Sequence, residues 1–390
     1  MRVRLKTAVR LVTDMTDLGS RPFVALDSLE SNTGRLLQGS ELPEIEAPDA
    51  GAAAVEPGDV LFGKLRPYLA KTWLADRFAY ASTELMCFRP GPSIHSRWLG
   101  YFVGSQPFVE WAVATSEGTK MPRTSWEKVA QFGLDIPALA VQRAIADYLD
   151  RETARIDALI AAKQRMVELL EERFAGQASA LLFSPNGYLP VRLKFICGTP
   201  TSGNRDHSSF TYTSEGVPCL RGVDLSKDYV DLSAVLRISA EDNQRHANTQ
   251  LHVGDLVIVR SGATAGRSAL VTRDLDGSNC VDLVIVRKSP ALEPRYLAYV
   301  VRSREIQDIV LYESSGALQP HFNAVDAGEI LVPMRSLDDQ KRVAKTLDDL
   351  ALAKERMVKV LLRQIDLLQD RRQALIIVAV TGQLHIPEAA

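Results

Sequence analysis

The chain has 390 residues, 46% of them hydrophobic, and a formal net charge of -2. This length and composition allow two or three domains with cores of their own, and the charge excludes a strongly basic nucleic-acid-binding protein. No apolar stretch approaches the roughly eighteen residues of a membrane span, and the four scattered cysteines include no C-x-x-C pair, so we expect a cytoplasmic protein without a disulfide framework or zinc ribbon.

Several short segments occur twice, in the same order. Val3-Arg4-Leu5-Lys6 recurs as Val191-Arg192-Leu193-Lys194, and Gly58-Asp59-Val60-Leu61 recurs as Gly254-Asp255-Leu256-Val257. Ile136-Pro137 followed by Gln142 recurs as Val332-Pro333 followed by Gln340. A period of nearly 200 residues is too long for a solenoid, so the chain contains two copies of one domain-sized unit.

The early part of each copy is predicted to be rich in strands. In the first copy, residues 59–62 and 84–88 are short apolar runs bounded by Gly or Pro, and residues 98–110 have a helical pattern. In the second copy, residues 255–260, 281–287 and 295–309 occupy the matching places. The constant offset of about 198 residues from Glu84/Asp282 to Gly118/Gly316 predicts a shared fold.

Each copy should end in one long helix, over residues 142–182 and 338–380. Each helix would be roughly 60 Å long at 1.5 Å per residue. The apolar positions of the first helix are Ile145, Leu149, Ile156, Leu159, Met166, Leu170 and Phe174. Those of the second are Val343, Leu347, Leu350, Met357, Leu361, Ile365, Leu368 and Leu375.

A long helix with one apolar stripe needs a partner, and the nearest match is the helix of the other copy. A pseudo-twofold relation between the copies would make the two helices antiparallel. Lys163 and Lys354 interrupt the stripes, as register-fixing residues do in coiled coils. The alternative is that each helix folds back on its own domain.

We find no motif for covalent chemistry. The segment from Arg260 to Ser268 resembles a P-loop, but the glycine spacing is one residue short, Arg267 replaces the lysine, and a strand follows instead of a helix. A tight hairpin presenting Arg260 and Arg267 is the better interpretation. Asp339-Gln340-Lys341 fits a helix start better than a nuclease site, and the six histidines lack metal-ligand spacing.

Loops rich in cations and polar groups are the remaining candidates for function. Residues 60–128 carry nine basic and five acidic residues, whereas residues 20–59 carry two basic and eight acidic ones, so the charge is segregated along the chain. Lys, Ser and Thr can hold phosphates, and Arg can read guanine. The candidate DNA contacts are Lys64, Arg66, Tyr68, Lys71, Lys120 and Arg123 in the first copy, and Arg205, His207, Arg221, Arg260, Arg267 and His321 in the second. The alternative for each is a solvated charged loop.

The whole chain resembles the specificity (S) subunits of type I restriction-modification systems. The family's G-D-[VIL] strand is matched by Gly58-Asp59-Val60, and its G-x-x-x-G-[RK] hairpin by residues 262–267. The [IV]-P stretch with a Gln-led helix is matched by residues 136–142, and the terminal V-T-G by Val380-Thr381-Gly382. The first copy departs from the pattern, with Gly63-Lys64-Leu65-Arg66 in place of the hairpin and Ser184-Pro185-Asn186-Gly187 in place of V-T-G.

The resemblance implies an α+β fold with two target recognition domains, at residues 1–140 and 186–336, and two spacer helices, at 141–185 and 337–390, paired as an antiparallel coiled coil. Each domain would read one half of an asymmetric, bipartite double-stranded DNA target, and the helices would set the gap and dock two modification (methyltransferase) subunits. Restriction (translocase/endonuclease) subunits are further expected partners. S-adenosylmethionine, ATP and Mg would belong to the partner subunits, with no cofactor or metal in this chain.

Two other classes are compatible with parts of the sequence. The first is an enzyme with its own catalytic site, which the missing motifs disfavour. The second is a coiled-coil scaffold that binds only protein and does not read bases. Substituting Lys64, Arg66, Lys120 and Arg123 by Ala separates the scaffold from a recognition subunit, because only the latter would lose DNA recognition.

Overall fold

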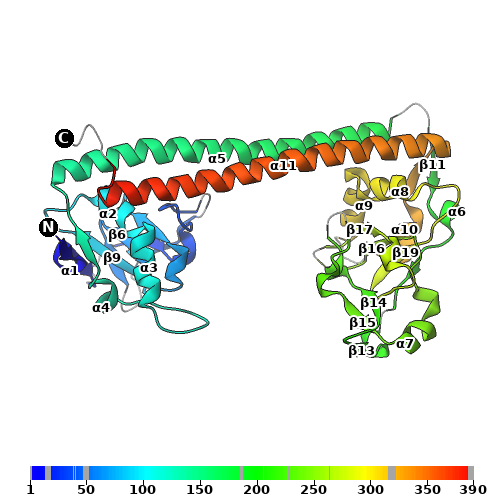
Figure 1. Ribbon diagram of the computed structural model, residues 1–390, viewed down its shortest axis with the longest axis horizontal. Helices are drawn as coiled ribbons and strands as arrows, with labels where there is room; N and C mark the ends of the chain where they lie inside the picture. The colour runs from blue at the N-terminus through cyan, green and yellow to red at the C-terminus, as the bar shows by residue number, and fades with distance from the viewer. Residues whose placement is uncertain are drawn as a thin grey trace. The chain divides into compact units, whose positions relative to one another are not determined.

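The computed structural model describes residues 2–13, 19–37, 39, 41–46, 52–184, 188–204, 206–226, 229–262, 264–314 and 322–384. The chain forms two compact units: unit 1 is Met1–Gln164 with Leu362–Ala390, and unit 2 is Arg165–Leu361. Each unit contains one sheet domain and a part of each long helix (Figure 1). This division cuts both long helices.

Sheet domain 1 is built from short strands and helices. Its strands are β1 (Arg2–Arg4), β2 (Val9–Val12), β3 (Arg21–Val24), β4 (Glu44–Ile45), β5 (Ala53–Val55), β6 (Val60–Gly63), β7 (Thr72–Leu74), β8 (Ala79–Ala81), β9 (Leu85–Pro90) and β10 (Gly133–Asp135). Its helices are α1 (Leu5–Ala8), α2 (Ser96–Val103), α3 (Gln106–Ala114) and α4 (Trp126–Val129), with 3-10 turns η1 (Leu26–Ser28) and η2 (Pro67–Leu69). The long helix α5 (Leu139–Leu182) follows.

Sheet domain 2 repeats this plan. Its strands are β11 (Leu189–Arg192), β12 (Thr201–Ser202), β13 (Tyr212–Thr213), β14 (Val217–Leu220), β15 (Leu236–Ile238), β16 (Leu256–Val259), β17 (Ser268–Leu270), β18 (Asn279–Cys280), β19 (Leu283–Val286) and β20 (Leu331–Met334). Its helices are α6 (Lys194–Cys197), α7 (Ala240–Arg245), α8 (Pro294–Arg302), α9 (Arg304–Ser314) and α10 (Ala324–Glu329). The 3-10 turns η3 (His207–Ser209), η4 (Gly222–Asp224), η5 (Leu232–Ala234), η6 (Ala247–Thr249) and η7 (Arg273–Leu275) complete the domain, and α11 (Leu337–Val380) follows.

The two domains share one sheet order. The sheet β2-β9-β6-β7 of domain 1 matches β12-β19-β16-β17 of domain 2. The small pair β1-β10 matches β11-β20, and each second sheet contains a parallel pair, β3 with β8 and β14 with β18. The predicted duplication of an α+β domain is therefore confirmed.

The helical segments predicted as continuous after these sheets are each two helices. In domain 1, α2 ends at Val103 and α3 begins at Gln106, and in domain 2 α8 and α9 are separated by Ser303. Ser105 Oγ donates to the Phe102 carbonyl at 2.6 Å, and Ser303 Oγ donates to the Val300 carbonyl at 2.7 Å. These serines compete for the backbone carbonyls of the preceding turn, so the helix stops and restarts. Pro107 adds to the break in domain 1 because it has no N–H to donate.

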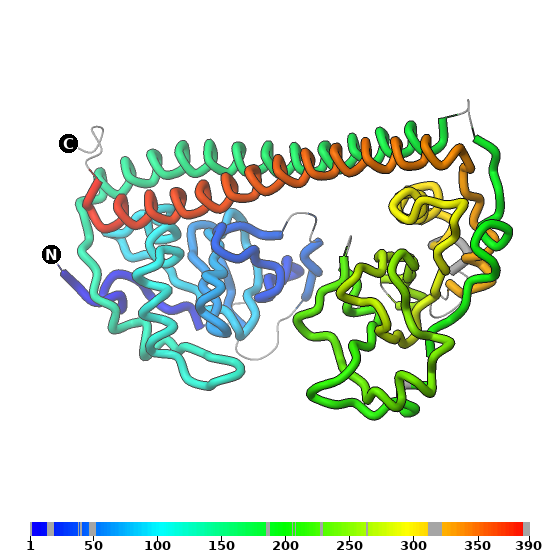
Figure 2. The backbone as a smooth tube through the Cα atoms, turned by 45° about the vertical axis from the view of Figure 1, so that its right-hand side comes forward, coloured from blue at the N-terminus to red at the C-terminus, as the bar shows by residue number. Residues whose placement is uncertain are grey.

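The long helices agree with the prediction to within three residues at their N-terminal ends and end where predicted. In each unit α5 lies beside α11 (Figures 1 and 2). Asp157 contacts Arg372 and Lys163 contacts Gln364 in unit 1, and Glu171 contacts Lys354 in unit 2. The partner number falls as the α5 number rises, so the helices are antiparallel. Both lysines that interrupt the stripes make contacts between the helices.

Each domain core takes in the ends of both long helices. In unit 1 the core includes Ile145 and Leu149 from α5 and Ile376 and Val380 from α11. In unit 2 it includes Ala178 and Leu182 from α5, with residues 343, 344 and 347 from α11. Pairing between helices and packing on the helix's own domain therefore occur together, although the sequence analysis treated them as alternatives.

A buried ion pair explains the repeated Gly-Asp motif. Asp59 is 2% exposed, and its carboxylate accepts from Arg89 Nε at 2.9 Å and from Nη2 at 2.7 Å. In domain 2, Arg287 Nη1 donates to buried Asp255 at 2.7 Å. Each aspartate also accepts a hydrogen bond from the backbone N–H three residues before it, which closes the turn before β6 or β16. Its ion pair with arginine links this turn to β9 in domain 1 and to the end of β19 in domain 2.

The repeated glutamine fastens the start of each long helix. Gln142 Oε1 accepts from the His95 N–H at 2.8 Å, and Nε2 donates to the carbonyls of Ser93 and Pro137 at 2.9 Å each. Gln340, fully buried like Gln142, makes the same three bonds to residues 291, 293 and 335. The interaction is therefore identical at an offset of 198 residues.

Removing the carboxylate of Asp59 should destabilise unit 1 strongly. Asp59→Ala leaves the guanidinium of Arg89 without its buried partner, which costs about 3–5 kcal/mol. Asp76→Ala breaks an exposed pair with Arg77 and should cost less than about 1 kcal/mol. Urea denaturation of the full chain measures both, and equal losses would contradict the role assigned to Asp59.

Candidate nucleic-acid interface

The structure brings the two candidate loops of domain 1 together. Leu65 forms an antiparallel bridge with Arg123, the Arg66 N–H donates to the Pro122 carbonyl at 2.7 Å, and the Thr124 N–H donates to the Lys64 carbonyl at 3.0 Å. We call residues 64–71 loop A and residues 117–124 loop B. Six predicted contact residues thus lie on one pair of neighbouring loops.

Three of the six predicted side chains are used inside the domain. Lys64 Nζ donates to the Thr83 carbonyl at 2.7 Å and Lys71 Nζ donates to the Leu26 carbonyl at 2.8 Å. Arg123 Nη2 pairs with Glu84 at 2.8 Å. Burial lowers the pKa of Lys64, against the opposing effect of nearby Glu84. These side chains therefore shape the loops.

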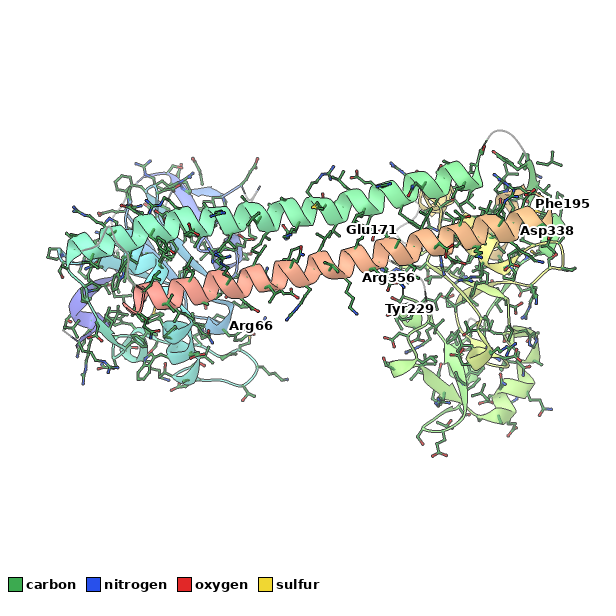
Figure 3. The ribbon with its side chains drawn as sticks, turned by 45° about the horizontal axis from the view of Figure 1, so that its top comes forward. Arg66, Glu171, Phe195, Tyr229, Asp338 and Arg356 are labelled. Carbon is green, nitrogen blue, oxygen red and sulfur yellow. The ribbon has the colours of Figure 1, made fainter. Side chains whose placement is uncertain are left out.

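The other three predicted residues face solvent. Arg66 (labelled in Figure 3) and Lys120 are exposed, and within the described part of the chain their side chains make no hydrogen bond or ion pair. Tyr68 is 51% exposed and Met121, beside Lys120, is 57% exposed. Arg66 has a left-handed backbone with φ of 49°, held by its bond to Pro122. Loops A and B therefore present two free cations, one aromatic ring and one thioether from a fixed backbone.

In domain 2, the glycine-rich segment is the predicted hairpin between the antiparallel strands β16 and β17. Arg260 pairs with Asp282 at 2.7 Å, and Ser261 Oγ donates to the same carboxylate at 3.0 Å. Arg267 is exposed, and its side chain makes no hydrogen bond or ion pair with a described residue. The hairpin therefore offers one free cation, and its other arginine supports the loop.

Arg221 is held in place by the turn that follows it. Its guanidinium donates to Asp224 from Nε at 3.1 Å and from Nη2 at 2.8 Å, and the Asp224 side chain is 3% exposed. Arg205 and His321 lie outside the described residues, as does the side chain of His207. The structure thus gathers the candidates of domain 1 more completely than those of domain 2.

Exposed apolar residues of domain 2 were missed in the sequence analysis. Val223 is 79% exposed and Tyr229 (labelled in Figure 3) is 63% exposed, both in the segment that follows β14. Apolar side chains can contact the thymine methyl group in the major groove. Charge does not distinguish them from other apolar residues in the sequence, although they flank the turn at Asp224.

The described residues contain no group of His, Cys, Asp and Glu that could hold a metal ion. Burial raises the pKa of Cys197 to about 11 and that of Cys219 to about 12, which disfavours the reactive thiolate. No helix within the described ranges is long and apolar enough to cross a membrane.

No family model matches this sequence. The chain is 21% identical over 281 residues to the type I restriction enzyme EcoBI specificity subunit of Escherichia coli. The match covers 64% of this chain and 58% of that protein, so the chain spans less than two thirds of this relative's length.

Solved structures share the fold across nearly the whole chain. A chain from work on complex assembly and conformational transition of the type I R-M system has a TM-score of 0.79, with 20% identity and 98% of both chains covered. The HsdS subunit from Thermoanaerobacter tengcongensis has a TM-score of 0.55, with 18% identity over 98% of this chain and 97% of that one. The fold is that of type I specificity subunits, and the resemblance seen in the sequence is confirmed.

The cations of loops A and B that are bonded inside the domain and those that are exposed should differ in their effect on stability. Lys64→Ala and Lys71→Ala each leave a backbone carbonyl without its donor, so each should lower the free energy of unfolding by about 1–2 kcal/mol. Arg66→Ala and Lys120→Ala remove exposed side chains and should change it by less than about 0.5 kcal/mol. Urea denaturation of the four variants distinguishes the groups, and a decrease at Lys120 equal to that at Lys71 would refute the division.

Proposed function

We propose that this chain is the DNA-recognition subunit of a type I restriction-modification complex. The observation that carries the proposal is the duplicated α+β domain with a long helix after each copy, in the fold of type I specificity subunits. Each sheet domain is the reader of one half of a bipartite double-stranded DNA target, and the paired helices set the gap.

The two half-sites differ in sequence because the two domains expose different side chains. Domain 1 presents Arg66, Tyr68, Lys120 and Met121, whereas domain 2 presents Arg267 with apolar residues such as Tyr229. Lysine contacts with phosphate position a protein on the duplex, whereas arginine can form two parallel bonds to guanine. The target is therefore asymmetric.

Catalysis belongs to partner subunits in this proposal. Two modification subunits supply the methyltransferase and bind S-adenosylmethionine, and restriction subunits, where present, use ATP and Mg. The helices expose apolar residues in unit 2, among them Leu352, Met357 and Val360, and exposed apolar patches are typical of protein interfaces. This chain itself is non-catalytic and acts in the cytoplasm.

Methylome sequencing tests this function directly. A host expressing this chain with its modification subunit should carry an asymmetric, gapped methylation motif that disappears when the chain is omitted. If an active modification subunit yields no chain-dependent motif, the recognition role is refuted and the protein-binding scaffold becomes the better account.

The free cations of loops A and B should govern the salt dependence of DNA binding. In the assembled complex, Arg66→Ala or Lys120→Ala should reduce the slope of log Kobs against log[salt] by about 1 for each phosphate that is no longer neutralised. The control Arg77→Ala removes an exposed arginine that pairs with Asp76 on a different loop of domain 1, and should leave the slope unchanged. If neither Arg66→Ala nor Lys120→Ala changes the slope of log Kobs against log[salt], these two side chains do not contact phosphates.

A further inference from the structure

In unit 1, Arg372, Asp157 and Arg35 form a polar cluster with the loop of residues 30–35, which we call the junction. It is not one of the contacts that recur in both copies. Arg372 of α11 is 8% exposed. Its Nη1 donates to the Asn32 carbonyl at 3.0 Å, its Nη2 donates to the Thr33 carbonyl at 3.2 Å, and its Nε lies 3.1 Å from Asp157 of α5. One buried guanidinium thus joins both long helices to a loop of sheet domain 1.

The same carboxylate also holds the loop from its other side. Arg35 Nη2 donates to Asp157 Oδ2 at 2.7 Å, so Asp157 bridges an arginine of α11 and an arginine of the loop. A buried charge is tolerated only when it is paired and its remaining donors are satisfied. Arg372 is paired with Asp157, and its Nη1 and Nη2 groups have acceptors only while the loop stays in this position.

The junction continues to loop A. Ser31 forms an antiparallel bridge with Lys71, and the Asn32 N–H donates to the Ala70 carbonyl at 3.4 Å. Lys71 is in turn bonded to the Leu26 carbonyl. A continuous series of contacts therefore leads from the helix pair to the loop that presents Arg66 and Tyr68.

Domain 2 has no equivalent attachment among its described residues. The bridge Leu29–Leu36 encloses residues 30–35 in unit 1, whereas the matching bridge Leu225–Val230 encloses the shorter segment 226–229. At the offset of 198 residues, Phe174 replaces Arg372 and Glu355 replaces Asp157. The ring centroid of Phe174 lies 4.7 Å from Lys354 Nζ. Glu355 is exposed, and its side chain makes no hydrogen bond or ion pair with a described residue.

The junction is a second point of attachment along the helices. One contact that the copies share is the bond from Tyr101 to Asp150 at 2.7 Å, which matches the bond from Tyr299 to Asp348. Asp157 lies about two helical turns, roughly 10 Å, beyond Asp150. Residues of the junction also line a groove of about 890 Å³.

We propose that Arg372, with Asp157 and Arg35, is a positioning group that holds loop A at one place along the helix pair and thereby enforces the gap between the half-sites. This inference rests on the proposed function. Arg372 is buried and bonds to backbone carbonyls of the loop of residues 30–35, so the group controls the spacing of the readout and leaves the identity of the bases to the exposed side chains.

Methylome sequencing of the complex with the modification subunit tests the role with Arg372→Met, which keeps an apolar stem and removes all three contacts. We expect the recognised sequence of both half-sites to stay the same. Methylation should also appear at sites whose gap is one base pair longer or shorter than the natural gap. The preference for the natural gap should fall about tenfold, or about 1.4 kcal/mol. Arg372→Lys should restore it in part, since an ammonium cannot bridge the carboxylate and both carbonyls.

The matched control is Arg371→Met, at the neighbouring exposed position of α11, which should leave the gap unchanged. If Arg372→Met does not fold, Arg35→Gln serves as the second variant. The Arg35 side chain is 55% exposed, so this substitution spares the fold and should relax the preference for the natural gap in the same direction. A uniformly weaker methylation with an unchanged gap, or altered bases in one half-site, would overturn the positioning role. The absence of any motif with the unsubstituted chain would instead overturn the proposed function itself.

Discussion

Burial of the helix ends in the domain cores is the constraint on which the rest of the structure depends. A helix of 44 residues with one apolar stripe is not stable alone in water. Here Leu149 and Val380 enter the core of unit 1, and Leu182 and Leu347 enter the core of unit 2. The sheet domains consequently cannot form complete cores without both helices, which ties folding of the sheet domains to formation of the helix pair. The glutamine interactions at Gln142 and Gln340 then fix where each helix begins.

The near-neutral charge reflects nearly equal numbers of basic residues (46) and acidic residues (48). Some of the arginines are also used inside the domains: each of Arg89, Arg287, Arg221 and Arg260 pairs with an aspartate, so these four side chains are not free for DNA phosphates. Phosphate contacts supply most of the non-specific affinity of DNA-binding proteins. Under the proposed function, partner subunits would therefore supply part of the affinity for phosphate.

Sequence patterns predicted the elements well and the contacts poorly. The duplication, the hairpin after β16 and both long helices follow from local periodicity and spacing, which one sequence displays. The partner of Asp59 is 30 residues away, and the carbonyl that Lys71 caps belongs to Leu26, so neither is visible in a local pattern. Lys64, Lys71 and Arg123 were grouped with Arg66 and Lys120 because charge alone cannot distinguish a cation used inside a domain from a free one. The link between Asn32 and Arg372 spans most of the chain.

The contacts that repeat and the contacts that do not repeat have different roles. Pairs such as Asp59 with Arg89, the glutamine interactions and the bond of Tyr101 recur at the same offset, so they belong to a frame common to both units. Loops A and B, the hairpin of domain 2 and the Arg372 junction differ between the copies. A frame that is independent of the loops allows the loops of each domain to change without altering the helices. The junction is the exception, because Arg372 binds backbone carbonyls of one particular loop, and a different domain 1 would need residues equivalent to 30–35 to preserve this contact.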